Sequence, residues 1–291
     1  MARDDPIPFR PPYAAEDATH MLYANSLWHH VLEYGKGSAM VLIPGMTAAA
    51  ANYGFFAQAL APVHRVFVPD ARGRGLSDHP GSGFTLDDYA ADLFGILDRL
   101  ELAAPILVGH SMGARIAAAF DVAFPHRAAG LVLIDPPLSG PGREPYPYPL
   151  AMYHSMFEIA HRSDDPIAAM REIEPSATEA ALAERIRWLR ATDEHAIVET
   201  YRGFHEEDYH ALHVSVTALA ILVRGERSVV VTSAGADELR ELRSDIPVID
   251  IPNAGHLVPH ENLAATCEVV RAFAGELNVE RGSSTRAHET R

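Results

Sequence analysis

The chain contains 291 residues, 48% of them hydrophobic, which is enough to bury one large core that carries an insertion. Its formal net charge of −15 repels phosphate backbones and anionic lipid headgroups, so we expect neither a nucleic acid nor a membrane as a partner. A single cysteine excludes an intrachain disulfide and a thiolate-bound structural metal. The N-terminus is acidic and rich in proline, without the basic start and apolar run of a signal peptide, and we therefore expect a cytoplasmic protein.

Short apolar runs rich in branched residues alternate with helical patterns along the chain, as is typical of a parallel sheet covered by helices on both faces. The turn at 35–38 is expected to join the first two runs as a hairpin. Apolar residues three or four apart predict a helix over 85–100 with Thr85 as its N-cap. We thus predict an α/β fold with a mostly parallel sheet of about eight strands, and the runs that can be assigned span residues 26–33, 39–43, 65–68, 105–108, 131–134, 218–223 and 247–251.

The alternation stops after the strand that ends at Asp135 and resumes near residue 214. The sequence between is first rich in Pro, Gly and Tyr and then helical and charged, which indicates a cap over the carboxyl ends of the strands, where open α/β sheets bind ligands. We expect a core made of residues 1–136 and 214–276 and an inserted helical cap over 137–213. The tail, 277–291, ends in a stretch without large apolar side chains and is expected to be disordered.

A candidate nucleophile lies in the motif Gly109-His110-Ser111-Met112-Gly113, a G-x-S-x-G between a predicted strand and a predicted helix. A tight strand-to-helix turn lifts the serine hydroxyl clear of the sheet, and it needs hydrogen in place of a side chain at the flanking positions. The bare pattern occurs often by chance in loops, but its position at a strand–helix junction favours catalysis. We therefore predict that Ser111 is the catalytic nucleophile.

A serine nucleophile needs a base, which in this topology comes from the last loop of the sheet, because the order along the chain is Ser, acid, His. His256 follows the final predicted strand and is the predicted base, with His260 in the same loop as the alternative. Ser228 stands where the acid is commonly found, so the acid has to be sought elsewhere. Asp135 ends the strand after the nucleophile helix and is the predicted acid, with Glu226 as a second candidate.

An oxyanion hole is expected beside the nucleophile. Gly45, in the loop after the 39–43 strand, lets the backbone turn inward and brings the N–H of Met46 toward the site. The N–H of Met112 approaches from the other side. Two such backbone donors converge on the developing negative oxygen and contribute about 3 kcal/mol each in comparable sites.

The sequences PGMT, DARGRGLSD, VGHSMGAR and NAGH together resemble the α/β-hydrolase superfamily over nearly the whole chain. Longer stretches, among them LVLIDPPLSGPGREPYP and NAGHLVPHENL, are similar to the N-formylmaleamate deformylases of bacterial nicotinate degradation. The resemblance implies an α/β-hydrolase fold with the triad acid at Asp135. It also implies a cofactor-independent amidohydrolase, without a metal, that cleaves N-formylmaleamate to maleamate and formate.

A small carboxylated substrate needs a cationic or donor-rich partner, because burying its charge unpaired is costly. Arg143, in the segment that leads into the cap, is the first candidate, and a surface pair with Glu144 is the alternative for its side chain. Thr47, beside the oxyanion loop, and His205, near the end of the cap, are further candidates.

Other patterns predict no site. The 35–38 turn lacks phosphate-loop spacing, and 73–75 lacks the third glycine of a dinucleotide fingerprint. We expect Arg72 and Arg74 to organise the loops at the strand ends. The histidines of 205–210 are five positions apart, which separates them by roughly 140° on a helix and argues against a zinc site.

Two other functions stay open. One is a carboxylesterase or carbon–carbon bond hydrolase that acts on a small carboxylic acid with the same triad. The other is a binding protein that retains the fold without catalysis, because a fold does not settle a function. The sequence is equally compatible with a monomer and a homo-oligomer.

Overall fold

The computed structural model describes residues 16–175 and 177–289. In this part of the chain the strands form one eight-stranded sheet in the order β1-β2-β4-β3-β5-β6-β7-β8. The pairs from β4 to β8 are parallel, whereas β1 and β2 run antiparallel to their neighbours. The predicted fold class is thereby confirmed, with strands at Ala18–Ala24 (β1), Leu27–Tyr34 (β2), Ser38–Ile43 (β3), His64–Pro69 (β4), Ile106–His110 (β5), Gly130–Ile134 (β6), Ala220–Gly225 (β7) and Val248–Ile251 (β8).

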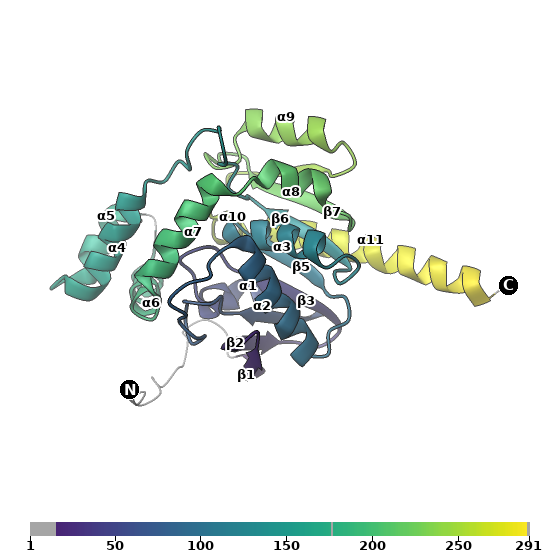
Figure 1. Cartoon of the computed structure of the whole chain (residues 1–291), viewed down its shortest axis with the longest axis horizontal. Coiled ribbons are helices and arrows are strands. Elements are labelled where there is room, and N and C mark those ends of the chain that lie inside the picture. Colours follow the sequence, from purple (N-terminus) through teal and green to yellow (C-terminus); the bar gives the residue numbers. More distant parts are fainter. Residues whose placement is uncertain (1–15, 176, 290–291) are drawn as a thin grey trace.

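Helices cover both faces of the sheet (Figure 1). The alternation along β3 shows why: Val41 and Ile43 are buried in one apolar cluster, while Met40 and Leu42 are buried in the other. A strand buried on both faces reads as a continuous apolar run, which is the pattern that the sequence shows. The first cluster takes in α2 (Leu86–Arg99), α3 (Met112–Ala123) and α9 (Ser233–Leu242), and the second takes in η1 (Ala50–Tyr53), α1 (Gly54–Leu60), α10 (Val258–Glu261) and α11 (Leu263–Glu289).

The turn at 35–38 does not form a hairpin, so that prediction is wrong. The strand β2 pairs with β4, which separates it from β3. The hairpin joins β1 to β2 instead, through Asn25 and Ser26, whose φ angles are 47° and 64°. Two left-handed residues make the two-residue turn that suits paired strands, but Asn-Ser is a weaker sequence signal for it than Asn-Gly. The prediction lacks β1 for this reason and because β1 alternates exposed and half-buried residues at the sheet edge.

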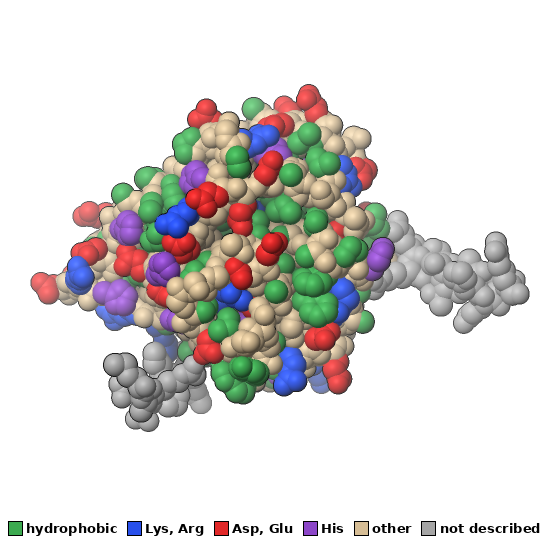
Figure 2. Space-filling model, viewed as in Figure 1, with side chains coloured by type: hydrophobic (Ala, Val, Ile, Leu, Met, Phe, Trp, Pro, Cys, Tyr) green, Lys and Arg blue, Asp and Glu red, His purple; other side chains and the backbone are tan. Residues whose placement is uncertain are grey.

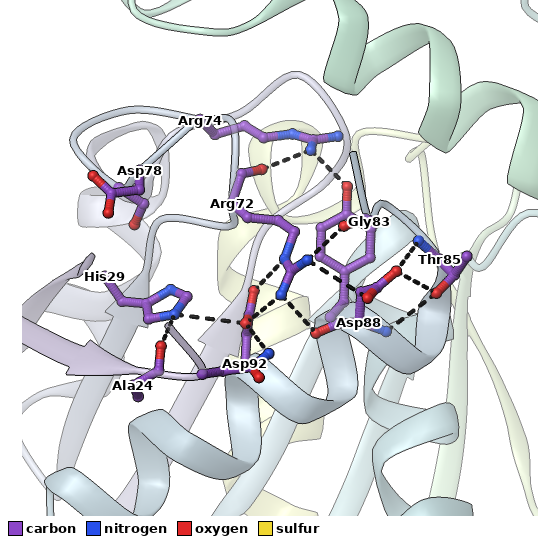
Figure 3. A network of polar contacts seen from close by, with 12 residues as sticks. Ala24, His29, Arg72, Arg74, Asp78, Gly83, Thr85, Asp88 and Asp92 are labelled. Atoms are coloured by element: carbon purple, nitrogen blue, oxygen red, sulfur yellow. Dashed lines mark hydrogen bonds and ion pairs between the residues drawn. The ribbon is translucent and has the colours of Figure 1, made fainter. Parts of the chain in front are cut away.

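A buried polar network holds the loop that follows β4 (Figure 3). Arg72 donates two hydrogen bonds of 2.5 Å and 2.6 Å to the carboxylate of Asp92 in α2. Asn25 donates to the same carboxylate, and His29 lies 3.6 Å from it, so one group joins the hairpin, the loop and the helix. The prediction of Thr85 as the N-cap of α2 is confirmed, since its side chain accepts a hydrogen bond from a backbone N–H of the first turn.

Helices fill the segment between β6 and β7 for which the sequence predicts a cap (Figure 1). Arg115 of α3, fully buried, fastens both ends of this segment to the core. Its guanidinium donates to the carbonyl oxygens of Ser139 at 3.3 Å, Phe204 at 3.2 Å and Glu207 at 2.5 Å. The cap segment carries α4 (Leu150–Arg162), α5 (Pro166–Ile173), α6 (Glu179–Arg190), α7 (Glu194–Glu206) and α8 (Tyr209–Ser215).

The C-terminal helix α11 continues to Glu289, so the structure has helix where the sequence predicts a disordered tail from residue 277. A nucleated helix extends at little cost per residue, and a lack of apolar side chains does not by itself end it. Residues 290–291 lie outside the described residues. So do residues 1–15, which include the start of the predicted core and the segment without signal-peptide character.

Acidic side chains are spread over the face of the molecule seen in Figure 2, with basic side chains between them. This distribution fits the formal net charge of −15.

Within the described parts of the chain, no helix combines the length and the hydropathy that a transmembrane span needs.

Candidate active site

Ser111 lies on the sharp turn between β5 and α3. Its backbone angles are φ 55° and ψ −117°, a combination that L-residues rarely adopt. A Cβ atom on Gly109 would lie 2.1 Å from the carbonyl oxygen of Gly113, and one on Gly113 would lie 2.0 Å from that of Ile43. The two glycines of the G-x-S-x-G motif are therefore a steric requirement of the turn that presents the serine.

His256 reaches this serine from the loop after β8. Its Nε2 lies 3.1 Å from the Oγ of Ser111, and its Nδ1 lies 2.7 Å from Oδ2 of Asp135. With Nδ1–H donating to the carboxylate, Nε2 carries no proton and accepts the serine hydrogen. The structure thus brings the three predicted residues into one hydrogen-bonded chain, called the candidate triad below. The alternative base His260 instead packs its ring against Tyr53, with 5.5 Å between the ring centroids.

The carboxyl group of Asp135 is fully buried at the end of β6. Its Oδ2 accepts a second hydrogen bond, of 2.6 Å, from the hydroxyl of Ser228. Burial raises the pKa of Asp135, and the hydrogen bonds from His256 and Ser228 oppose that rise. Glu226, the other acid considered, accepts a hydrogen bond from the backbone N–H of Asn253 at the surface and has no recorded contact with the imidazole.

The loop that carries His256 is also held by His110, the last residue of β5. The ring of His110 lies beside the nucleophile, 3% exposed, and its Nε2 is 2.7 Å from the carbonyl oxygen of His256. Its Nδ1 bonds to the hydroxyl of Tyr53 in η1. Burial lowers the pKa of His110 well below its usual value, so the ring stays neutral. The sequence analysis assigned no role to His110 or Tyr53, since no spacing rule links either residue to the loop that it holds.

The loop of the predicted oxyanion hole lies beside the nucleophile. A Cβ atom on Gly45 would be 3.5 Å from the Cβ of Ser111. Met112 is the first residue of α3, where a backbone N–H has no acceptor within its own helix. Arg74, fully buried, donates from Nε to the carbonyl oxygen of Met46 at 3.1 Å, and its Nη2 lies 3.7 Å from the sulfur of Met112. One guanidinium therefore contacts both residues of the predicted hole, as expected of an arginine that organises the strand-end loops.

Comparison with known families agrees with the fold seen in the structure. Residues 38–263 match the family model of the alpha/beta hydrolase fold. The chain belongs to this family. The match spans every strand from β3 to β8, and so it covers all three residues of the candidate triad.

The relatives of this hydrolase include enzymes that act on small molecules. It is 38% identical over 245 residues to N-formylmaleamate deformylase of Pseudomonas putida, which covers 82% of this chain and 90% of the relative. It is 28% identical over 267 residues to 2-(acetamidomethylene)succinate hydrolase of Mesorhizobium japonicum, covering 84% and 90%. A crystal structure of an N-formylmaleamic acid deformylase variant from Pseudomonas putida S16 matches with a TM-score of 0.82 at 32% identity, covering 87% of this chain and 100% of that one. The protein is therefore an enzyme, and its reaction is a hydrolysis.

A tyrosine of the cap segment contacts the candidate triad of this hydrolase. The hydroxyl of Tyr146, which lies between β6 and α4, is 3.3 Å from Nε2 of His256. It also interacts with the hydroxyls of Ser111 and Tyr153. Tyr146 was not predicted as a site residue, although it stands in the stretch LVLIDPPLSGPGREPYP that carries the family resemblance.

The three predicted partners of a substrate carboxylate lie in different places. Thr47 is buried in the oxyanion loop, and no hydrogen bond of its hydroxyl is found within the described residues. Arg143 pairs with Glu238 of α9 at 2.7 Å. His205 is not free to bind a ligand either, because Nε2 accepts the N–H of Tyr146 at 3.1 Å and Nδ1 bonds to a carbonyl oxygen of its own helix. Of the three, only Thr47 belongs to the loop whose Gly45 lies beside the nucleophile.

Arg185, in helix α6, is a partly buried cation that was not predicted as a site residue. Its Nη2 lies 2.9 Å from the carboxylate of Glu174, while its Nε is buried without a hydrogen-bond partner among the described residues. Its charge opposes the burial-driven rise in the pKa of both Tyr53 and Tyr153. Trp188, one turn further along the same helix, is buried in the same cluster as Tyr53. No local pattern distinguishes Arg185 from the other arginines of its helix.

No group of three or more His, Cys, Asp or Glu side chains that could hold a metal ion is found in 16–175 or 177–289. The histidines of the 205–210 segment contact different partners. Whereas His205 bonds to the backbone of Tyr146, His210 lies 3.4 Å from the carboxylate of Glu238.

Proposed function

We propose that this hydrolase cleaves the formyl C–N bond of N-formylmaleamate, giving maleamate and formate, with Ser111 as the nucleophile. The observation that carries the proposal is the continuous chain of hydrogen bonds from Ser111 through His256 to Asp135, at 3.1 Å and 2.7 Å. The substrate is suggested by the deformylase relative, which shares 38% of residues over most of both chains.

The first half of the reaction transfers the formyl group to the enzyme. His256 Nε2 takes the hydroxyl proton while the oxygen of Ser111 attacks the formyl carbon. This carbon is electrophilic and unhindered, because the nitrogen lone pair is shared between two carbonyl groups. Buried Asp135 holds the imidazole in the right tautomer and stabilises its charged form. His256 then gives the proton to the departing nitrogen, and a formyl ester remains on Ser111.

The second half returns the enzyme to its starting state. Maleamate leaves, and a water molecule takes its place beside His256. The imidazole removes a proton from this water as it attacks the ester carbonyl, and it then protonates Ser111 as formate departs. In both halves the negative oxygen faces the N–H groups of Met46 and Met112, each of which stabilises it by about 3 kcal/mol in comparable sites.

The substrate carboxylate needs a partner within this acidic protein, whose formal net charge is −15. Arg143, the first candidate from the sequence, gives both of its terminal nitrogens to Glu238. Arg185 is also paired, through Nη2 with Glu174 at 2.9 Å, but its Nε is a buried donor without a partner among the described residues, and its charge acts on both Tyr53 and Tyr153. We assign the carboxylate to Arg185, with the Thr47 hydroxyl as a second donor nearer the nucleophile.

The test compares three substrates on the wild-type enzyme: N-formylmaleamate, 4-nitrophenyl acetate and a dienoic ring-fission ketone. The proposal predicts a kcat/KM for N-formylmaleamate at least about 100-fold above the other two. A higher value for the ester would identify a carboxylesterase. A higher value for the ketone would identify a carbon–carbon bond hydrolase, and either result would overturn the proposed substrate.

A further inference from the structure

The cap segment places the hydroxyl of Tyr146 next to Nε2 of His256, the atom that accepts the serine proton. The Tyr146 hydroxyl lies 3.3 Å from Nε2 of His256, while the Ser111 hydroxyl lies 3.1 Å from the same atom. A neutral imidazole whose Nδ1–H is engaged has a single lone pair at Nε2. Ser111 uses that lone pair during attack, so the Tyr146 hydroxyl, which also interacts with the Tyr153 hydroxyl, no longer donates to His256 and is available to a bound substrate.

The position of this hydroxyl coincides with the path of the leaving group. After attack, the proton on Nε2 of His256 is transferred to the departing atom, which must then lie within hydrogen-bond distance of Nε2. The Tyr146 hydroxyl is already within about that distance of the same nitrogen in the structure. A group bonded to the departing atom therefore comes to lie next to this hydroxyl.

The tyrosine is held firmly where it is. Its side chain is 5% exposed, and its ring packs against that of Phe204 with 5.1 Å between centroids. Its backbone N–H donates to Nε2 of His205 at 3.1 Å. Burial raises the pKa of Tyr146 well above its usual value, so the phenol keeps its proton and stays a hydrogen-bond donor. A fixed neutral donor stabilises charge that develops in front of it without having to reorganise.

We infer that Tyr146 is a catalytic residue whose hydroxyl donates a hydrogen bond to the carbonyl oxygen adjacent to the departing nitrogen. This inference rests on the proposed function. When the formyl C–N bond breaks, its electron pair moves to the nitrogen and is shared with the neighbouring amide carbonyl. His256 delivers the proton to the nitrogen, and Tyr146 stabilises the charge on the oxygen without losing its own proton. The residue would therefore favour substrates whose leaving group is an amide or imide over those whose leaving group is a simple alkoxide or phenolate.

The experiment compares the wild type with Tyr146→Phe, which keeps the buried ring and removes only the hydroxyl. Each enzyme is assayed with N-formylmaleamate and with 4-nitrophenyl formate, whose phenolate leaving group has no carbonyl oxygen beside the scissile bond. We expect kcat for N-formylmaleamate to fall roughly 10- to 100-fold and kcat for the ester to change less than about threefold. Tyr148→Phe is the matched control, because its ring lies 5.8 Å from that of His256 while, among the described residues, no hydrogen bond joins its hydroxyl to the candidate triad.

Equal losses on both substrates would overturn the inference, since they would mean that Tyr146 only positions His256. No loss on either substrate would overturn it as well. The proposed function is judged separately, from the wild-type rate with N-formylmaleamate alone. If the wild type releases formate while the Tyr146→Phe penalty is the same for both leaving groups, the inference fails and the proposed function stands.

Discussion

The Ser228 hydroxyl donates a hydrogen bond of 2.6 Å to the same Oδ2 atom of Asp135 that accepts the imidazole Nδ1–H. The two residues follow neighbouring strands, Asp135 after β6 and Ser228 after β7. Ser228 stands where the triad acid is commonly found, and its hydroxyl thus forms a hydrogen bond with the candidate acid of the adjacent strand, Asp135. Ser228 Oγ in turn lies 3.1 Å from the backbone N–H of Val230, which fixes the direction of its own hydrogen.

Replacing Ser228 by Ala is expected to shift the acid side of the pH–rate profile to higher pH. The hydrogen bond from Ser228 stabilises the carboxylate of Asp135 and opposes the burial-driven rise in its pKa. Without that bond the pKa of Asp135 rises further, and the ionised form that catalysis needs is lost at a higher pH as the solution is acidified. The measurement is kcat/KM from about three pH units below neutrality to about two units above it. Ser228→Thr, which keeps the hydroxyl, should retain the wild-type profile, and an unshifted profile in Ser228→Ala would contradict the assigned contact.

Asp135→Asn is expected to lower kcat by roughly 10⁴-fold, because a neutral amide neither holds the required imidazole tautomer nor stabilises the charged ring. Glu226→Gln should change kcat less than about twofold, since Glu226 bonds to the Asn253 backbone at the surface. Steady-state formate release by the two variants decides whether Asp135 or Glu226 is the catalytic acid. If the Glu226 variant lost activity and the Asp135 variant kept it, the acid would be misassigned.

Arg185→Met is expected to raise KM for a carboxylated substrate by roughly 10- to 100-fold, the effect of losing a hydrogen bond between charged groups. Activity on the neutral ester 4-nitrophenyl acetate should stay within about threefold of wild type, because that substrate has no carboxylate to bind. Arg143→Met serves as the matched control, since Arg143 is paired with Glu238. A larger rise in KM from the Arg143 variant would restore the partner first proposed from the sequence.

The residues that could be predicted from the sequence are those fixed by local geometry. Ser111 is recognisable because its two flanking glycines are required by a turn with φ 55°. Asp135 and His256 could be placed because each follows a strand whose carboxyl end lies at the same edge of a parallel sheet. The strands themselves read as apolar runs, because most are buried on both faces.

The residues that escaped prediction depend on contacts between distant segments. Tyr146 is brought to the imidazole by the path of the segment between β6 and α4, which leaves no periodic signal. The pairing of Arg185 in α6 with Glu174 after α5 leaves none either. The same holds for the wrong hairpin at 35–38, since only the tertiary arrangement shows that β4 lies between β2 and β3. Arg143 was favoured because the sequence does not reveal Glu238, 95 positions away, as its partner.

The most direct measurement is formate release from N-formylmaleamate by the wild type and by Ser111→Ala at equal enzyme concentration. The wild type should release one formate for each maleamate formed. The variant should be slower by roughly 10⁴- to 10⁶-fold, because no other hydroxyl is raised on the β5–α3 turn to accept the formyl group. Release of formate by Ser111→Ala at a rate within about tenfold of wild type would contradict the nucleophile assignment. Absence of formate with the folded wild-type enzyme would contradict the proposed substrate.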